Sequence, residues 1–288
     1  MFHIPGVLTR IDPVTEPVPV VFDVPRSGTW YPCEFRTKVS FDDLHRSVSM
    51  HLPDLYQGVP QYGAQLLVAH FPNAFIDANR NETDIDPSLL ADDWKGTLPL
   101  NPTVKSELGI GLIHSVAGQT GTPLYDYKLT SAEIQSRIDQ YFLPYHDELA
   151  RIIQEGNDRH KVSYHISCHS MASIGGSSTL DKGQPRTDFD IGDLNGQSCE
   201  PEFAELVVNT LKSFGFNVTS NFHYAGAEAV RRHSRVSERK HSLQIEINRK
   251  LYMNEQDFSK SADFADIQKV LAKLADEIRL YALAQSSS

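Results

Sequence analysis

Two histidines and a cysteine fall within nine residues of the chain, in the segment SYHISCHSM from Ser163 to Met171. The segment has the pattern of a buried strand that runs out into a polar turn. His169 suits a metal ligand, the base of a nucleophile pair, or a strand-end side chain bonded to backbone. Because adjacent residues of a strand point to opposite faces, the position of Cys168 argues against a Cys–His pair.

A carboxylate in the segment HSLQIEIN, residues 241–248, is the next candidate for chemistry. Polar and aliphatic residues alternate there, so one face of the expected strand carries Leu243, Ile245 and Ile247. Glu246 lies on the opposite face. Partial removal from water would raise the pKa of its carboxyl group and suit it to general acid or base catalysis. A solvated strand face explains the same pattern.

A third candidate is FIDANR, Phe75 to Arg80, which alternates apolar and polar residues as an extended segment does. Asn79 and Arg80 together suit recognition of a carboxylate, because a guanidinium group offers a planar pair of donors. Ion pairing of Arg80 with Asp84 or Asp86 accounts for the same spacing. The spacing leaves both interpretations open.

A locally basic tract, EAVRRHSRVSERKH at residues 228–241, stands out in a chain whose formal net charge is −10. Such a tract either lines a pocket for anionic substrates or forms a solvated loop.

The composition is that of a soluble globular protein and argues against several functions. With 27 Lys and Arg against 37 Asp and Glu, the chain lacks the basic surface that nucleic acids and anionic membranes require. It has no run of roughly eighteen apolar residues, so we expect no membrane span. Cys33, Cys168 and Cys199 have no CxxC spacing, so we expect a cytoplasmic protein rather than a disulfide framework.

The elements that must position these residues alternate between strands and helices. Strands are expected at 19–24, 64–71, 163–171, 216–221 and 241–248, and helices at 130–156, 201–215 and 264–284. This alternation predicts a single α/β domain with a mixed, mostly parallel sheet covered on both faces. In such folds the polar residues just beyond the strand ends usually carry the chemistry.

The ends of the chain and one helix can be placed more closely. We expect an extended N-terminal arm over residues 1–18, one domain over 19–284, and a disordered tail over 285–288. Thr130 and Glu133 have the spacing of a capping box at a helix start, and Pro144 predicts a kink further along.

Seven stretches, taken in chain order, make the sequence similar to the N-formylglutamate amidohydrolase (deformylase) family. They are VFDVPRSGTWYP, GAQLLVAHFPNAFIDANRNETDIDP, GLIHSVAGQTGTPLYDYKLT, RIDQYFLPYHDEL, SYHISCHSM, DIGDLNGQSC and SLQIEINRKLYM. They run from about residue 20 to 255, nearly the whole chain. No single stretch is diagnostic, but their shared order makes the resemblance specific.

The resemblance implies a three-layer αβα domain similar to the zinc carboxypeptidases. It implies hydrolysis of an N-formyl or related N-acyl amide on an acidic amino acid, the last step of one histidine-degradation route. The ligand would be a small anionic amino-acid derivative, and zinc would polarise the carbonyl and activate water. By position, His169 would be a metal ligand and catalytic residue, and Glu246 the general base or acid. Asn79 and Arg80 would hold the substrate carboxylate.

Two of the three presumed metal-ligand positions depart from the family pattern. Where the family usually has PHSG or PHAG this chain has PRSG, so Arg26 replaces a presumed histidine ligand. The carboxylates expected in the next helix are replaced, in VSMHLPD, by Val48, Ser49 and Pro53. An arginine cannot ligate a cation at neutral pH, and its charge repels one.

These departures leave two hypotheses. In the first, the protein is a hydrolase that builds its metal site differently, with His51, Asp54 or His45 beside His169. In the second, the metal is lost, Arg26 supplies the positive charge and holds the ligand, and the pocket binds a small carboxylate without hydrolysing it. The hydrolase is the leading hypothesis, because the ordered motifs are retained.

Overall fold

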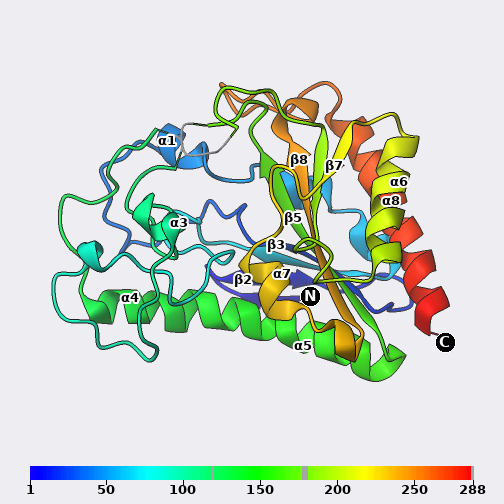
Figure 1. Ribbon diagram of the computed structural model, residues 1–288, viewed down its shortest axis with the longest axis horizontal. Helices are drawn as coiled ribbons and strands as arrows, with labels where there is room; N and C mark the ends of the chain where they lie inside the picture. The colour runs from blue at the N-terminus through cyan, green and yellow to red at the C-terminus, as the bar shows by residue number, and fades with distance from the viewer. Residues whose placement is uncertain (119, 177–180, 287–288) are drawn as a thin grey trace.

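The computed structural model describes residues 1–118, 120–176 and 181–286, and in that part of the chain eight strands form one mixed sheet (Figure 1). The strands lie in the order β1-β2-β4-β3-β5-β8-β6-β7. Their bounds are β1 (Phe2–Ile4), β2 (Leu8–Ile11), β3 (Val20–Val24), β4 (Gln65–Ala69), β5 (Ser163–Met171), β6 (Phe189–Gly192), β7 (Val218–Ser220) and β8 (Lys240–Asn248).

Four parallel strands, β4, β3, β5 and β8, form the centre of the sheet. The antiparallel strands β1 and β2 extend one edge, and β6 and β7 extend the other, with β6 antiparallel to β8. β3, β5 and β8 are buried along nearly their whole length, as parallel strands covered by helices on both faces must be. The predicted mixed, mostly parallel sheet is confirmed.

Helices cover both faces of this sheet. They are α1 (Phe41–His45), α2 (Leu52–Leu55), α3 (Val104–Glu107), α4 (Ser131–Arg137), α5 (Leu143–His160), α6 (Pro201–Ser213), α7 (Glu228–His233) and α8 (Phe264–Ser286). α6 and α8 pack together on one face, and α5 packs against β3, β4 and β5 on the other (Figure 1). The three-layer architecture is therefore confirmed. Among the described residues, none of the helices has the length and apolar character that a bilayer span requires.

The junction of α4 and α5 matches its sequence signals. The hydroxyl of Thr130 accepts a bond from the backbone N–H of Glu133 at 3.1 Å, and the Glu133 carboxylate accepts the Thr130 N–H at 2.7 Å. A π-helical turn, Ile138–Phe142, separates the two helices, and Pro144 follows in the first turn of α5. Because proline has no N–H to donate, the regular bonding pattern is broken where the kink is predicted.

The N-terminal segment is part of the sheet rather than a separate arm. β1 and β2 pair with each other, and β2 pairs with β4 along four residues, Leu8 to Ile11. Leu8 is fully buried in the core beneath α5. This hairpin was not expected from the sequence, because its strands are short. At the other end, α8 continues to Ser286, past the expected start of a tail at 285, and residues 287 and 288 lie outside the described residues.

FIDANR was predicted as extended and is not a strand. The carbonyl of Pro72 accepts the N–H groups of Phe75 and Ile76, and the Asp77 carboxylate accepts the N–H of Asn79, so the segment is a series of turns. Its apolar residues alternate because they fill the core beneath α5, which mimics the pattern of a strand.

The burial of Leu8 yields a stability prediction. If β2 belongs to the core, Leu8→Ala removes a fully buried side chain and lowers the free energy of unfolding by about 2–5 kcal/mol. The exposed Val14, in the same N-terminal segment, provides the control, because Val14→Ala changes stability by within about 0.5 kcal/mol. Urea denaturation monitored by circular dichroism measures both. Equal, small effects would show that residues 1–18 behave as an arm.

Candidate active site

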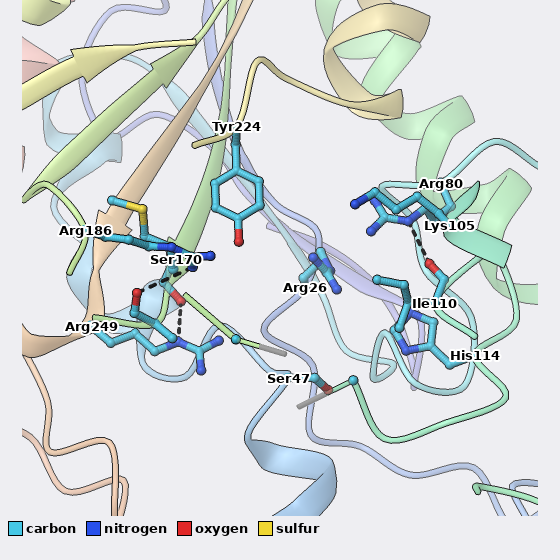
Figure 2. Close-up of a pocket in the computed structure, with 14 residues that line it drawn as sticks. Arg26, Ser47, Arg80, Lys105, Ile110, His114, Ser170, Arg186, Tyr224 and Arg249 are labelled. Carbon is cyan, nitrogen blue, oxygen red and sulfur yellow. Dashed lines mark hydrogen bonds between the residues drawn. The ribbon is translucent and has the colours of Figure 1, made fainter. Parts of the chain in front are cut away.

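A cavity of about 130 Å³ opens where the parallel strands β3, β5 and β8 end (Figure 2). Arg26 follows β3, Ser170 and Met171 end β5, and Arg249 follows β8, so all three strand ends contribute to its lining. This is the edge of the sheet at which the sequence pattern predicts the chemistry. The remaining charged or aromatic lining residues are Arg80, Lys105, His114, Arg186 and Tyr224.

The register of β5 on β8 places His169 directly beside Glu246. Both side chains are buried, with exposed fractions of 1% and 5%. They share the face of the sheet opposite Cys168 and Ile245, whose side chains lie in the core under α6 and α8. The predicted alternation of faces is confirmed on both strands, and the solvated strand face proposed for Glu246 is wrong.

A directed chain of hydrogen bonds orients the Glu246 carboxyl group. The backbone N–H of Ala229 donates to Asn79 Oδ1 at 2.9 Å, which fixes the orientation of that amide. Asn79 Nδ2 then donates to Gln244 Oε1 at 3.3 Å, and Gln244 Nε2 donates to Glu246 Oε1 at 2.9 Å. Glu246 Oε2 has no hydrogen-bond partner in the described part of the chain. One carboxyl oxygen is thus fixed, and the other is buried without a bond from any described residue.

Burial raises the pKa of Glu246 to about 7, although Arg26, Arg249 and Arg186 act in the opposite direction. Near neutral pH the group therefore populates both its carboxylate and its acid form. A carboxyl group with this balance can remove a proton in one step and return it in the next.

His169 is held as a neutral ring. Its Nε2 lies 3.2 Å from Asn79 Nδ2 and 3.0 Å from Ser167 Oγ. Because the Asn79 amide nitrogen can only donate, Nε2 is an acceptor and the ring proton is assigned to Nδ1. Burial, followed by the charge of Arg26, lowers the pKa of His169 to about 3. The nitrogen that could bind a metal or a proton is already engaged.

Arg26 is anchored by a buried carboxylate. Its Nη2 lies 3.3 Å from Asp77 Oδ2, and His114 Nε2 lies 3.2 Å from the same oxygen. Burial would raise the pKa of Asp77, but Arg26 and Arg80 outweigh it and hold the pKa below its ordinary value. Gly28 permits the turn that follows Arg26, because a Cβ there would lie 2.2 Å from the carbonyl oxygen of Phe71.

Arg80 and Lys105 form one wall of the cavity and are joined through Ile110. Arg80 Nε donates to the carbonyl of Ile110 at 2.9 Å, and the Ile110 N–H donates to the carbonyl of Lys105 at 2.8 Å. The buried Asp84 fixes this turn by accepting both the N–H and the hydroxyl of Thr103 at the start of α3. Figure 2 shows Arg80, Lys105 and His114 together on one side of Arg26.

The Lys105 ammonium group has no hydrogen bond or ion pair with another described residue, and its side chain is open to solvent at the cavity mouth. Partial loss of water around the ammonium, with repulsion from Arg80 and Arg26, lowers the pKa of Lys105. A cation held near two other cations is a site for an anion.

The arginines on the opposite wall are committed to the protein. Arg249 donates to Ser170 Oγ and to the carbonyls of Arg46 and Val48. Arg186 forms a bidentate pair with Asp181, with distances of 2.7 and 2.9 Å. The positive charge available to a ligand therefore lies on the side of Arg26, Arg80 and Lys105.

Tyr224 directs its hydroxyl group into the cavity between the two walls (Figure 2). The buried Asp190 holds its loop, because this carboxylate accepts the backbone N–H groups of Phe222, His223 and Tyr224. The guanidinium of Arg186 lies 5.2 Å from the centre of the Tyr224 ring. Burial raises the pKa of Tyr224, so its hydroxyl group remains a donor at neutral pH.

The three presumed metal-ligand positions converge, but their side chains do not fit zinc. The Ser49 N–H donates to the carbonyl of Arg26 at 2.8 Å, and the Ser170 N–H donates to Ser49 Oγ at 3.3 Å, one residue from His169. A guanidinium, a hydroxyl and an engaged imidazole do not form a zinc donor set. In the part of the chain described, no three His, Cys, Asp or Glu side chains are grouped to hold a metal. Two like unit charges 4 Å apart repel by about 4 kcal/mol near a protein surface, so Arg26 disfavours a cation here.

The alternative ligands proposed from the sequence lie away from the cavity. His51 Nε2 lies 2.7 Å from the carbonyl oxygen of Phe258, and Asp54 pairs with Lys260 at 2.6 Å. His45 packs against the ring of Tyr31, with centroids 5.9 Å apart. None of the three lines the cavity, so a rebuilt metal site at His169 is not formed by the described residues.

Two other predicted groups lie outside the cavity lining. Asn79, like His169 and Glu246, does not line the cavity, and its amide atoms bond to Ala229, Gln244 and His169. The basic tract 228–241 is also absent from the lining. Two of its arginines, Arg231 and Arg232, pair with Glu228 instead.

Lys105, Tyr224 and Gln244 were not found from the sequence. Lys105 comes from the four-residue helix α3 and Tyr224 from a loop, and only the folded arrangement brings them to the cavity. Gln244 could have been found, because it shares the polar face of its strand with Glu246.

Comparisons with known proteins give matches over most of the chain. A family model described as N-formylglutamate amidohydrolase matches residues 18–253. The chain is 27% identical over 227 residues to an N-formylglutamate deformylase of Pseudomonas putida, covering 77% of each protein. It is 26% identical over 270 residues to an N-formylglutamate deformylase of Pseudomonas aeruginosa, covering 89% of this chain and 90% of the relative.

Solved structures show the same relationship. A crystal structure of an N-formylglutamate amidohydrolase from Ralstonia eutropha JMP134 is 37% identical and has a TM-score of 0.89, covering 96% of this chain and 98% of that one. A structure from Agrobacterium tumefaciens, 17% identical with a TM-score of 0.65, covers 98% of this chain and 97% of that one, and shares the fold.

The hydrogen-bond chain predicts how the pKa of Glu246 responds to Gln244. Gln244→Met keeps a similar volume but removes the N–H that stabilises the carboxylate, so the pKa of Glu246 rises above about 7. Carbon-13 NMR titration of protein labelled at the glutamate carboxyls measures the shift, and Glu246→Gln assigns the signal. An unchanged titration would show that Gln244 does not donate to Glu246.

Proposed function

The chain belongs to the N-formylglutamate amidohydrolase family, and on that premise we propose that it hydrolyses the amide of a small N-formyl or N-acyl amino acid with an acidic side chain. One observation carries the proposal. Glu246 is a buried carboxyl group with a pKa of about 7 and one oxygen without a partner among the described residues, and three cations that line the cavity, Arg26, Arg249 and Arg186, act on it although it does not itself line the cavity.

The cavity charges favour a small anionic amino-acid derivative as the ligand. Arg80 and Lys105, tied together by the backbone of Ile110, hold one carboxylate of the substrate. The bonds that Arg80 makes to the carbonyls of Ile110 and Asn79 keep its guanidinium in place. Binding at this wall places the amide of the ligand toward Arg26 and Glu246.

Glu246 carries the proton through the reaction. As a carboxylate it removes a proton from the water molecule that attacks the carbonyl carbon. As an acid it then gives this proton to the leaving nitrogen while the C–N bond breaks, which yields formate and the free amino acid. Gln244 and Asn79 keep the carboxyl group oriented for both transfers.

His169 acts as a positioning residue in this proposal. Its ring is neutral, and its Nε2 accepts a hydrogen bond from the Asn79 amide, which also donates to Gln244. His169 therefore neither removes the proton nor binds a metal. Zinc, the cofactor that the resemblance implies, would polarise the carbonyl when bound. Arg26, Ser49 and His169 do not form a zinc donor set, so the proposed reaction does not use zinc.

The first test removes the carboxyl group of Glu246. Glu246→Gln keeps the shape of the side chain but cannot carry a proton, so formate release from N-formylglutamate falls by about 10²–10⁴-fold. The melting temperature and substrate binding change little. Glu205→Gln, at an exposed position on α6, is the control and retains full activity. An equally active Glu246→Gln variant would remove this residue from the mechanism.

The pH profile provides a second readout of the same group. The base must be in its carboxylate form in the free enzyme, so kcat/KM rises with pH through about 7 and levels off above it. Stopped assays of formate release across this range measure the profile. A kcat/KM that does not change with pH around 7 would contradict the assignment of Glu246 as the base.

Lys105 is tested through substrate binding. Lys105→Gln removes one of the two cations on the wall, so KM for N-formylglutamate rises by roughly tenfold while kcat changes little. Lys128→Gln, an exposed lysine outside the cavity lining, is the matched control. A Lys105→Gln variant with unchanged KM would show that the carboxylate binds elsewhere. Absence of formate release from every N-formyl amino acid would instead leave a carboxylate-binding protein without turnover.

A further inference from the structure

Arg26 lies at the centre of the cavity, where the family pattern places a metal ligand. Figure 2 shows its guanidinium between the wall of Arg80 and Lys105 and the wall of Arg186 and Arg249. Two hydrogen bonds hold Arg26 near the end of β5. The Ser49 N–H donates to the Arg26 carbonyl, and the Ser170 N–H donates to the Ser49 hydroxyl group.

Arg26 faces the pair of strands that carries Glu246. It lines the cavity together with Ser170 at the end of β5 and Arg249 just after β8, three residues beyond Glu246. An amide bound in the cavity can therefore place its carbonyl oxygen at Arg26 with the carbonyl carbon on the side of Glu246.

Arg26 also retains donors that the protein does not use. Its Nη2 contacts Asp77 at 3.3 Å, whereas its buried Nε has no hydrogen-bond partner within the described residues. Arg249, by comparison, has all three of its nitrogens bonded to protein oxygens. A fixed guanidinium with free N–H groups is a preorganised site for negative charge that develops in a reaction.

We propose that hydrolysis at this site needs no bound metal, because the Arg26 guanidinium stabilises the oxyanion of the tetrahedral intermediate. The inference rests on the proposed hydrolase function and names the group that replaces the Lewis acid. Asp77 holds the guanidinium in place but does not take its proton, since arginine stays charged at every working pH.

The step balances with water as the only co-reactant. Water oxygen forms a bond to the carbonyl carbon, its proton passes to Glu246, and the carbonyl electron pair moves to the oxygen beside Arg26. The intermediate then collapses, the C–N bond breaks, and the proton on Glu246 passes to the nitrogen. Formate and the amino acid leave, and Arg26 and Glu246 return to their starting states.

The test measures formate release and metal content in the same protein sample. Wild-type protein is assayed as purified, after dialysis against dipicolinate, and after addition of zinc, with zinc counted by plasma mass spectrometry. We expect kcat/KM to be the same in all three states and zinc to stay substoichiometric. Activity that disappears with the chelator and returns with zinc would overturn the inference while leaving the hydrolase function intact.

Arg26 itself is tested by substitution and chemical rescue. Arg26→Ala lowers kcat by about 10²–10³-fold, the loss seen when a single oxyanion donor is removed. Millimolar guanidinium chloride, well below denaturing levels, restores part of that loss, which a purely structural role would not allow. Arg26→Lys keeps the charge next to Asp77 and retains more activity than Arg26→Ala. Arg36→Met, at an exposed arginine outside the cavity, is the control.

Melting temperatures separate loss of catalysis from loss of folding. If Arg26→Ala does not fold, Arg26→Lys decides the question, because it must lose kcat without losing its melting transition. Wild-type levels of kcat in a folded Arg26→Lys or Arg26→Ala variant would overturn the role of the guanidinium. A wild-type protein that releases no formate with or without zinc would refute the proposed function, and the catalytic role of Arg26 with it.

Discussion

The parallel pairing of β5 with β8 is the constraint on which the site depends. Its register sets His169 beside Glu246, and the alternation of side chains then directs Cys168 and Ile245 into the opposite core. A shift by one residue would exchange the polar and apolar faces of both strands, which the two cores would not tolerate. The position of the carboxyl group is therefore maintained by the hydrophobic packing of the whole sheet.

The electrostatics of the cavity follow from what each charge is bonded to. Five cationic side chains line it, but Arg186 and Arg249 are neutralised or saturated by protein oxygens. The remaining positive charge, on Arg26, Arg80 and Lys105, is offset in part by the buried Asp77, and Arg26 also acts on Glu246, whose carboxyl group burial keeps partly protonated. This combination of an unsatisfied cationic wall and a proton-carrying carboxyl group is suited to an anionic amide and would be costly in a site without a ligand.

Much of the fold could be predicted from the sequence, because β3, β5, β8 and the long helices have strong periodicity. Glu246 and His169 were found for the same reason, since their strands assign each residue to a face. FIDANR was misread because core-filling turns reproduce the alternation of a strand. The bonds of Asn79 to Ala229 and Gln244 could not be predicted, because they join segments about 150 residues apart and no local pattern records them. Lys105 and Tyr224 were missed for that reason as well.

The central claim is that this chain hydrolyses an N-formyl acidic amino acid with Arg26 in the role of a metal ion. The most direct measurement follows the carbon-13 signal of formyl-labelled N-formylglutamate by NMR, with metal-stripped protein in excess over the labelled substrate. We expect the formamide signal to be replaced by that of free formate within a single turnover, and we expect zinc not to change the rate. Persistence of the formamide signal until zinc is added would contradict it.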